Sequence, residues 1–288
     1  MSDKSIIFKA YLGNPLKEVN EKTPARCGFR SIVFKDVYHI FEEGIIGGRW
    51  RIYKRTSLDG ISLGSRSTAL FPFGGKGAFD EFGQADPTVI YNGTWRMWFD
   101  AMNGSTEWDK IGYATSIDGN NWINKGPVLS RGEGWDSQAV HHPVCMEHEG
   151  IYYMYYGGCD GSNHYNVKNI GLATSKDGIS WIKEKTNPII TNGKYNEWDC
   201  KYVRPSVPVF IDDRWFMFYW GFDGKIHSMG VAESDDLIKW EKIGKFISGT
   251  NNHNGVTASQ TLKEGSKIRM WYKMFNNWNL NTGEIELI

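Results

Sequence analysis

The stretch IGYATSIDGNNW at residues 111–122 decides the fold, because it returns along the chain at a constant spacing. Close copies are IGLATSKDGISW at 170–181 and MGVAESDDLIKW at 229–240, and a weaker copy is IYKRTSLDGISL at 52–63. The four copies begin 59 residues apart. A fixed period of this kind indicates a repeat architecture such as a solenoid or a propeller, in which one small unit recurs and packs against its neighbours.

Each copy follows a second repeated feature, a β-hairpin. DPTVIYNGTWRMWFDA at 86–101 consists of a β-run, an Asn-Gly turn and an aromatic β-run, which is a hairpin signature. Four further hairpins have the same layout, and they begin at residues 31, 142, 208 and 259. Each of the first four hairpins is followed by a copy of the motif, which predicts a third strand ending in a turn.

We therefore predict an all-β protein, a five-bladed β-propeller whose blades have four antiparallel strands. The chain contains no linker, so residues 1–288 form a single domain in this prediction. A fifth copy of the third strand would begin near residue 283, where GEIELI ends the chain. We expect SIIFKAYL at 5–12 to pair beside that segment and close the last blade, since closure removes an exposed sheet edge.

The repeated aspartates of the SxDGxxW motif are interpreted as turn residues. Asp59, Asp118 and Asp177 recur at the same place in successive copies. A catalytic site needs different groups that converge, whereas a turn needs the same group each time. The repetition therefore favours a structural role for these carboxylates.

Composition excludes several classes of function. The chain has 33 basic and 33 acidic residues, so it lacks the basic excess of a nucleic-acid-binding protein. The start MSDKSIIFKAYLGN has no apolar signal-peptide region, and no segment has 18 consecutive apolar residues, so we expect a cytoplasmic protein that does not bind membranes. The four cysteines have no metal-ligand spacing. We predict no cofactor and no catalytic metal, and leave open a structural calcium ion in the channel; the oligomeric state is not predicted.

Functional residues are expected where the repeats differ. In a propeller the first strand of each blade lines the central channel, and Asp86, His142 and Arg204 each precede a proline at the start of such a strand. Turn chemistry alone would not select three different ionisable residues at equivalent positions. We expect these side chains to meet at one mouth of the channel, together with Arg30 and, less securely, Thr257. The loops after the second strands add further polar residues at this mouth: Glu43, Asp100, Asp160, Asp223 and His164.

The inner strand ADPTVIYNGTWRMWF and the repeated IGYATSxDGxxW resemble the five-bladed propeller glycosidases. This group includes the arabinanases and xylosidases of family 43, the fructosidases of families 32 and 68, family 117, and the mannoside phosphorylases of family 130. The resemblance covers nearly the whole chain through its repeats and selects no single family. In these enzymes the Asp of a "DP" on an inner strand is the general base or nucleophile, which implies that role for Asp86.

Other family features do not carry over. A family 43 enzyme has a Glu before a proline two blades later, where YVRPSVP has Arg204 and Ser206, and the fructosidase NDPNG signature is missing. Glycosidic cleavage usually requires two carboxyl groups on either side of the bond. The acid partner of Asp86 would then come from Asp100, Asp160, Asp223 or Glu43, and our catalytic candidates are Asp86, Asp160 and Asp223.

The remaining candidates are expected to bind substrate: Arg30, His142, Arg204, Asp100, Glu43 and His164. Guanidinium groups match phosphate and carboxylate oxygens in a bidentate way, so we expect a saccharide substrate that is anionic or used together with phosphate. The predicted function is cleavage or transfer of a glycosidic bond in the central channel. Two alternatives stay open, a glycoside phosphorylase or glycosyltransferase on the same scaffold and a sugar-binding propeller without catalysis.

Overall fold

The computed structural model describes residues 6–16, 27–104, 110–161, 168–248, 255–274 and 280–287. Apart from the short 3₁₀ turn Gly134–Asp136, the regular structure in these ranges is β-strand. No helix in the described ranges is long and apolar enough to cross a membrane.

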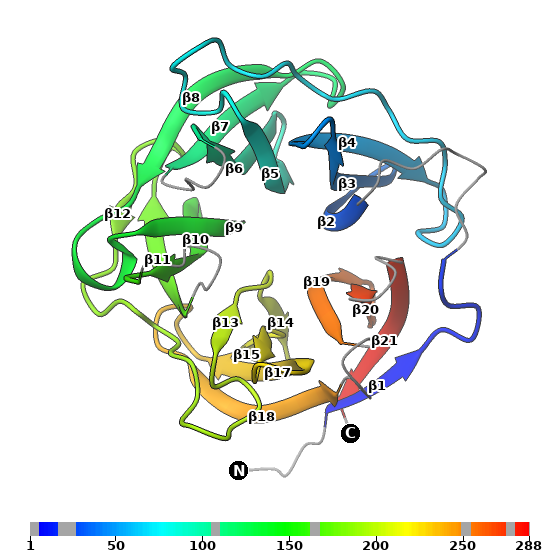
Figure 1. The fold of residues 1–288 in the computed structure, drawn as a ribbon. Coiled ribbons are helices and arrows are strands. Elements are labelled where there is room, and N and C mark those ends of the chain that lie inside the picture. Colours follow the sequence, from blue (N-terminus) through cyan, green and yellow to red (C-terminus); the bar gives the residue numbers. More distant parts are fainter. Residues whose placement is uncertain are drawn as a thin grey trace.

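The strands form four hydrogen-bonded sheets that stand around a common centre (Figure 1). One sheet contains the strands from both ends of the chain: β1 (Ile6–Ala10), β21 (Leu280–Leu287), β20 (Lys267–Met274) and β19 (Val256–Glu264). The largest sheet contains the strands that follow β1 in sequence: β2 (Cys27–Lys35), β3 (Val37–Ile46), β4 (Arg49–Ser57), β5 (Gly83–Tyr91), β6 (Trp95–Met102), β7 (Lys110–Ser116) and β8 (Ile123–Ser130).

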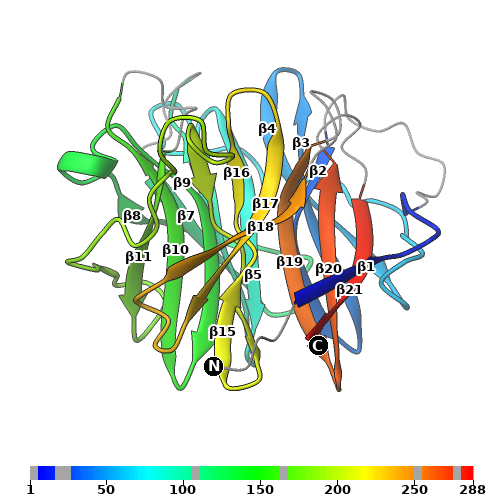
Figure 2. The ribbon, with the colours of Figure 1, turned by 90° about the horizontal axis from the view of Figure 1, so that it is seen from below.

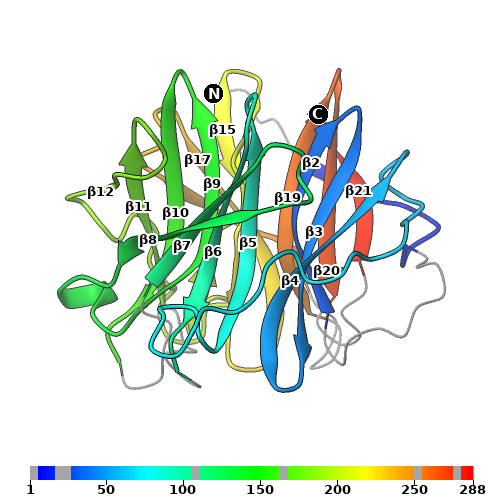
Figure 3. The same ribbon diagram turned by 90° about the horizontal axis from the view of Figure 1, so that it is seen from above.

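The other two sheets come from the middle of the chain. The four-stranded one contains β9 (Ala139–His148), β10 (Ile151–Cys159), β11 (Asn169–Ser175) and β12 (Ile182–Lys183). The six-stranded one contains β13 (Tyr202–Arg204), β14 (Val209–Ile211), β15 (Arg214–Met217), β16 (Trp220–Phe222), β17 (His227–Ser234) and β18 (Glu241–Ser248). Strands β2, β5, β9, β13 and β19 lie nearest the centre (Figure 1), and the strands run between the two faces of the ring (Figures 2 and 3).

The arrangement confirms the prediction of an all-β, propeller-like fold. Hydrogen bonding gives four sheets and not five, because β2–β4 and β5–β8 are joined into one sheet of seven strands. The join is a single parallel pair, Trp50 with Gly83, whereas every other pairing in that sheet is antiparallel.

The predicted pairing of the two chain ends is confirmed. Strand β1 runs antiparallel to β21, with Ile6 opposite Leu287 and Ala10 opposite Gly283. Phe8 packs edge-on against Tyr272 of β20, with ring centroids 5.5 Å apart. The N-terminal strand thus covers the outer edge of the C-terminal sheet (Figure 2).

The interpretation of the repeated aspartates as turn residues is also confirmed. In the copy at 175–181, Asp177 Oδ1 accepts the backbone N–H groups of Ile179 at 2.8 Å and Ser180 at 2.7 Å, and the Ser175 hydroxyl bonds the same carboxylate at 2.9 Å. The same hydrogen bonds recur around Asp59, Asp118 and Asp236. They hold the pKa of Asp59, Asp118 and Asp177 well below the usual carboxyl range.

Two of these turns form hydrogen bonds to tryptophans of a neighbouring sheet. The carbonyl of Gly178 accepts the indole N–H of Trp98 at 2.8 Å, and the carbonyl of Gly60 accepts that of Trp271 at 2.8 Å. Gly178 has a positive φ of 75°, and a Cβ there would lie 2.9 Å from Trp98, so both conformation and space require glycine. The Gly60–Trp271 bond ties the first repeat to the last, which makes the turns part of the closure of the ring.

We expect removal of residues 1–12 to lower the melting temperature by several degrees, because it uncovers the edge of β21 and removes the Phe8 contact. In a chain of this size about 1 kcal/mol corresponds to roughly 2–4 °C. Thermal unfolding followed by circular dichroism measures the change, and removal of residues 1–5 alone is the matched control. An unchanged melting temperature after the longer truncation would show that β1 does not contribute to closure.

Candidate active site

The inner strands β5 and β9 are irregular where they carry the predicted site residues. The pairing of β5 with β6 shifts register between Ala85 and Thr88, and Asp86 has a φ of 47°. His142 on β9 has a φ of 50° and lies at the corresponding register shift. Residues other than glycine adopt this left-handed conformation at a cost of order 1–3 kcal/mol, so the surrounding structure must hold it in place.

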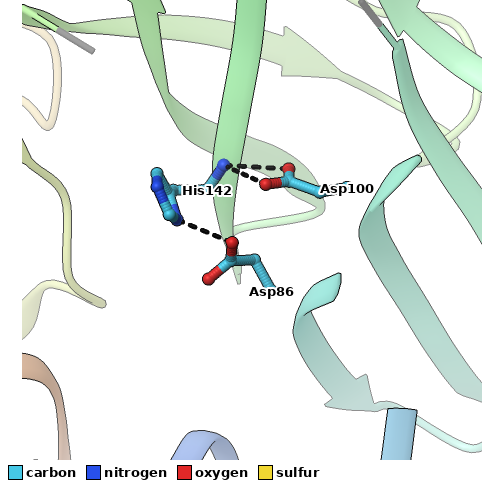
Figure 4. Close-up of side chains that lie close together, drawn as sticks. All are labelled: Asp86, Asp100 and His142. Atoms are coloured by element: carbon cyan, nitrogen blue, oxygen red, sulfur yellow. Dashed lines mark hydrogen bonds and ion pairs between the residues drawn. The ribbon is translucent and has the colours of Figure 1, made fainter. Parts of the chain in front are cut away.

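Two carboxylates from neighbouring second strands hold these positions. Glu43 Oε2 of β3 accepts the backbone N–H of Asp86 at 2.9 Å. Asp100 of β6 accepts the backbone N–H of His142 through both oxygens, at 2.9 and 3.1 Å (Figure 4). Both carboxylates are almost fully buried, at 1% and 0% exposure. Glu43 and Asp100 were expected to contact substrate; the contacts seen for them fix the backbone beside the site.

The Asp86 side chain lies between two partners. Its Oδ1 lies 2.6 Å from Arg30 Nε, and its Oδ2 lies 2.8 Å from His142 Nδ1 (Figure 4). Arg30 also forms an ion pair with Glu43. Burial opposes ionisation of Asp86, but Arg30 and His142 outweigh it and hold the pKa of Asp86 well below the usual carboxyl range. An ionised carboxylate at Asp86 is the state that a general base or nucleophile requires.

Asp100, the neighbour of Asp86, ionises less readily. Burial raises the pKa of Asp100 well above the usual carboxyl range, and the adjacent charge of Asp86 raises it further. The two side chains share a hydrogen bond, and of the two Asp100 is the one whose protonated form is favoured. Groups in direct contact cannot stand on opposite sides of a glycosidic bond, for which carboxyl separations of about 5 Å or more are needed.

His142 contacts Asp86 and carries no positive charge at neutral pH. Burial, with Arg204 and Arg30 nearby, lowers the pKa of His142 to about 3. The neutral ring donates its Nδ1–H to Asp86 and stacks on His141, with ring centroids 5.4 Å apart. Burial thus keeps the imidazole of His142 neutral at neutral pH, and the cation that contacts Asp86 is Arg30.

Arg204 of β13 packs against aromatic rings. Its guanidinium lies 4.6 Å from the centre of the Trp220 ring and 5.1 Å from that of Tyr202. Burial lowers the pKa of Arg204, although an arginine stays protonated at neutral pH.

Lys273 of β20 belongs to the same cluster and was missed by sequence reasoning. It is 1% exposed, and its charge interacts with those of Arg30, Glu43, Asp86 and Arg204. The signal was present in the repeat, because RMWYK at 269–273 aligns with RMWFD at 96–100 and places Lys273 where the other hairpin has Asp100.

The same alignment explains two other candidates. The positions equivalent to Asp100 in the hairpins that begin at residues 142 and 208 are Gly157 and Trp220, whereas Asp160 and Asp223 lie three residues further on. Asp160 is exposed and pairs with Lys168 at 2.9 Å. Asp223 closes a turn, accepting the backbone N–H groups of Lys225 and Ile226 at 2.7 Å.

Among the described residues, no hydrogen bond or ion pair joins Asp160 or Asp223 to Asp86. A catalytic role for Asp160 and Asp223 stays a prediction. His164 lies outside the described residues. Thr257 is buried on β19, opposite Lys273 in the strand register.

A small cavity of about 30 Å³ lies beside Asp86. Its lining combines charged, aromatic and proline side chains: Arg30, Asp86, Pro87, His142, Pro143, Val144, Pro205 and Trp220. This volume accommodates a water molecule and is far too small for a sugar ring.

Comparison with known proteins shows the family to which the chain belongs. Residues 84–281, which include Asp86, Asp100, His142 and Arg204, match the family described as the glycosyl hydrolases family 32 N-terminal domain. The chain belongs to this family. Family and fold together support a carbohydrate-active, glycosidase-like enzyme and leave substrate and reaction open.

Curated relatives of this family 32 domain are distant. An uncharacterised protein of Mycobacterium tuberculosis is 32% identical over 150 residues, which cover 49% of this chain and 48% of that protein. A fructan 6-exohydrolase of Beta vulgaris is 24% identical over 179 residues, 58% of this chain and 29% of that enzyme. The chain thus spans about half the length of the first of these proteins and less than a third of the second.

Solved structures resemble the family 32 domain over almost its full length. A structure from the family 130 mannoside phosphorylases, which contain glycoside hydrolases that target β-1,2 mannosidic linkages in Candida mannan, has a TM-score of 0.73 at 15% identity and covers 96% of this chain and 93% of its own. The β-1,2-mannobiose phosphorylase of Listeria innocua has a TM-score of 0.67 at 15% identity, with coverages of 98% and 96%. At such identity the likeness shows the fold.

The site of this family 32 domain is poorly suited to a metal ion. Asp86, Asp100 and His142 place one potential ligand atom each within 4.8 Å of one another. The same Asp86 carboxylate is already paired with the Arg30 guanidinium, and a divalent cation would be repelled by that charge. We therefore identify none of the three as a metal ligand. The expected absence of a metal or cofactor, and the structural calcium ion left open, stay predictions.

The protonated state of Asp100 predicts the behaviour of Asp100→Asn. An amide is always neutral and can still accept the His142 N–H and donate to Asp86, so the variant should fold. In wild type the pKa of Asp100 is higher in the folded protein than in the unfolded chain, where it is about 4. Protonated Asp100 therefore stabilises the fold at low pH, and this stabilisation is lost as the pH rises from about 4 through the pKa of the folded protein. The free energy of unfolding of Asp100→Asn, relative to wild type, should therefore increase with pH at up to about 1.4 kcal/mol per unit.

Urea unfolding between about pH 4 and pH 8 measures this difference. Asp136→Asn is a matched control, because Asp136 is a buried carboxylate paired with Lys183 outside the site. A difference between Asp100→Asn and wild type that stays constant over this range would contradict the protonated state.

Proposed function

We propose that this chain cleaves or transfers a glycosidic bond, with Asp86 acting as general base or nucleophile. The observation that carries the proposal is the state of Asp86, a buried carboxylate kept ionised by Arg30 and His142 at a channel opening. Family membership supports the reaction class, and the position of Asp86 before a proline on an inner strand supports its role.

The proposed position of the site assumes five repeating units around the channel. The sheet of seven strands divides naturally at its single parallel pair into β2–β4 and β5–β8. With the other three sheets this division gives five units, and their inner strands supply Arg30, Asp86, His142, Arg204 and Thr257.

The charges of the site favour an anionic substrate or co-substrate. Arg30 and Arg204 are cationic, and Lys273 is partly so because burial lowers its pKa to about 7, whereas Asp86 and Glu43 are the carboxylates that pair with Arg30. The raised pKa of Asp100 favours its protonated form, which does not reduce the positive charge. A neutral sugar does not need such an excess, whereas phosphate or a sugar carboxylate does.

Among anions, phosphate gives the most economical chemistry. Hydrolysis usually requires a second carboxyl across the bond from the first, and among the described residues Asp100 is in contact with Asp86 and not opposite it. In phosphorolysis the phosphate itself attacks the anomeric carbon, so no carboxylate is needed to activate a water, and the oxygen that leaves takes the proton of the hydrogen bond between Asp100 and Asp86. The structural likeness to a β-1,2-mannobiose phosphorylase supports this version of the proposal, with hydrolysis of an acidic sugar as the second candidate.

Replacement of Asp86 by Asn tests the catalytic assignment. The amide keeps the shape of the side chain and removes its charge, so turnover of an active glycoside should fall by about two orders of magnitude or more. Release of free sugar and of sugar phosphate, measured with and without inorganic phosphate, separates hydrolysis from phosphorolysis. Asp235→Asn is the control, since Asp235 is exposed and its Arg214 contact of 3.7 Å is remote from the site. Near wild-type turnover in Asp86→Asn would rule out the assignment.

Replacement of Arg204 by Ala tests the anion. The variant should bind inorganic phosphate about 10-fold or more weakly, because a charge-assisted hydrogen bond contributes about 1.5–3 kcal/mol. Binding of neutral oligosaccharides should change little. Isothermal titration calorimetry measures both ligands, and Arg214→Ala, which removes a surface arginine, is the control. Failure of the wild-type protein to bind any anion, together with binding of neutral sugar, would favour a neutral-glycan enzyme or a sugar-binding propeller.

A further inference from the structure

A large cavity lies in the central channel, toward the end of the inner strands that is opposite the candidate active site. Its volume is about 740 Å³, whereas the cavity beside Asp86 has about 30 Å³. Asp86 lies nearer the start of β5, and residues 89–91 at the end of β5 line the large cavity. The other inner strands β2, β9 and β19 (Figure 1) also contribute residues close to their ends, and Val207 before β14 completes the lining.

Two hydroxyl groups lie along the strands between the large cavity and the small one. The hydroxyl of Ser31 on β2 accepts the backbone N–H of Val89 on β5 at 3.1 Å. The hydroxyl of Thr88 on β5 accepts that of Cys145 on β9, also at 3.1 Å. Both hydroxyl residues are buried, and the described residues that line one cavity are different from those that line the other. The large cavity is therefore a separate site from the one beside Asp86.

The buried polar groups in the lining of the large cavity are already paired. Gln260 uses both ends of its amide on one residue, because its Oε1 accepts the backbone N–H of Ile32 and its Nε2 donates to the carbonyl of Ile32, each at 2.7 Å. The hydroxyl of Tyr38 donates to Glu264 at 2.6 Å, and Glu264 also pairs with Arg269 at 3.2 Å. The rest of the inner lining is aliphatic, aromatic or sulfur-containing, so it offers a ligand apolar contact and few hydrogen bonds.

Charges of both signs stand at the opening of this cavity. Lys263 and Glu147 both line it and are exposed. A charged ligand would be attracted by one of them and repelled by the other, so its charge would contribute little to binding. A sugar would also fit poorly, because its hydroxyl groups would lose water without finding partners inside. A volume of this size is typical of pockets that take small organic molecules.

We propose that this end of the channel binds an uncharged, largely apolar small molecule, either aromatic or aliphatic. Val33, Ile90 and Leu262 line the cavity and are only half-buried, so a ligand removes further apolar surface from water. The inference does not depend on the proposed function, because it rests on residues other than those that line the cavity beside Asp86.

Titration with N-phenyl-1-naphthylamine tests the inference. This probe is uncharged and apolar, and its fluorescence increases when it moves from water into an apolar environment. The wild-type chain should bind it at a single saturable site. Ile90→Trp should weaken binding roughly 10-fold or more, because the larger side chain takes up space that the probe needs. The matched control is Ile123→Trp, since Ile123 on β8 is 61% exposed and lies outside the cavity lining.

A second variant and a direct measurement complete the experiment. Leu262→Gln keeps the approximate size of the side chain and makes it polar, so it should also weaken binding, because the probe would have to remove water from an amide. Thermal unfolding followed by circular dichroism shows whether each variant is folded. A crystal structure of the wild-type protein with the probe should show it in contact with Val33, Ile90 and Leu262.

Four results would overturn the inference and leave the proposed function intact. The first is a wild-type protein without saturable binding, or a crystal structure with the probe elsewhere. The second is an unchanged affinity in folded Ile90→Trp and Leu262→Gln. The third is displacement of the probe by a neutral saccharide, which would assign the cavity to a sugar. The fourth is loss of probe binding as the chain dimerises at higher concentration, which would assign this face to a second copy.

Discussion

The left-handed backbone at Asp86 and His142 is the constraint on which the site depends. Neither residue would adopt this conformation in a regular strand, and each is held there by a hydrogen bond from its N–H to a buried carboxylate of a neighbouring hairpin, Glu43 or Asp100. The orientation of the Asp86 side chain is therefore set by contacts between repeats. These contacts form only when neighbouring repeats are packed against each other. The carbonyl groups of Gly60 and Gly178 stabilise this packing, because they accept hydrogen bonds from tryptophans of adjacent sheets. Fold and site are thus stabilised by the same packing of repeat on repeat.

The fold could be predicted because its signals are repeated and local. Each turn needs the same Ser, Asp and Gly, so four copies of SxDGxxW or its variants mark four equivalent strand ends. Asp86 could be predicted for the opposite reason, since it differs from the residues at equivalent positions in the other repeats. The closure by β1 could be predicted by counting strands, because the last blade had only three strands at the C-terminal end of the chain and needed a fourth at its outer edge.

Other features of the site depended on information that single residues do not carry. Asp160 and Asp223 were selected because they follow the second strands, whereas strict alignment of the hairpins points to Gly157, Trp220 and Lys273. Charge was harder still. Burial and the nearby Arg204 lower the pKa of His142, and burial and the nearby Asp86 raise the pKa of Asp100. Neither effect can be judged before the strands are packed. The repeats indicate which positions lie close to Asp86, whereas the charges of these groups depend on packing.

The low pKa of Asp86 connects the anion to the chemistry. A carboxylate held strongly ionised by Arg30 and His142 is a weak base, and base catalysis improves as the pKa of the base approaches the working pH. An anion that draws on the Arg30 guanidinium would weaken its hold on Asp86 and so raise the basicity of that carboxylate. In the proposed function the site is therefore least reactive when empty, and binding of the anion prepares Asp86 to act.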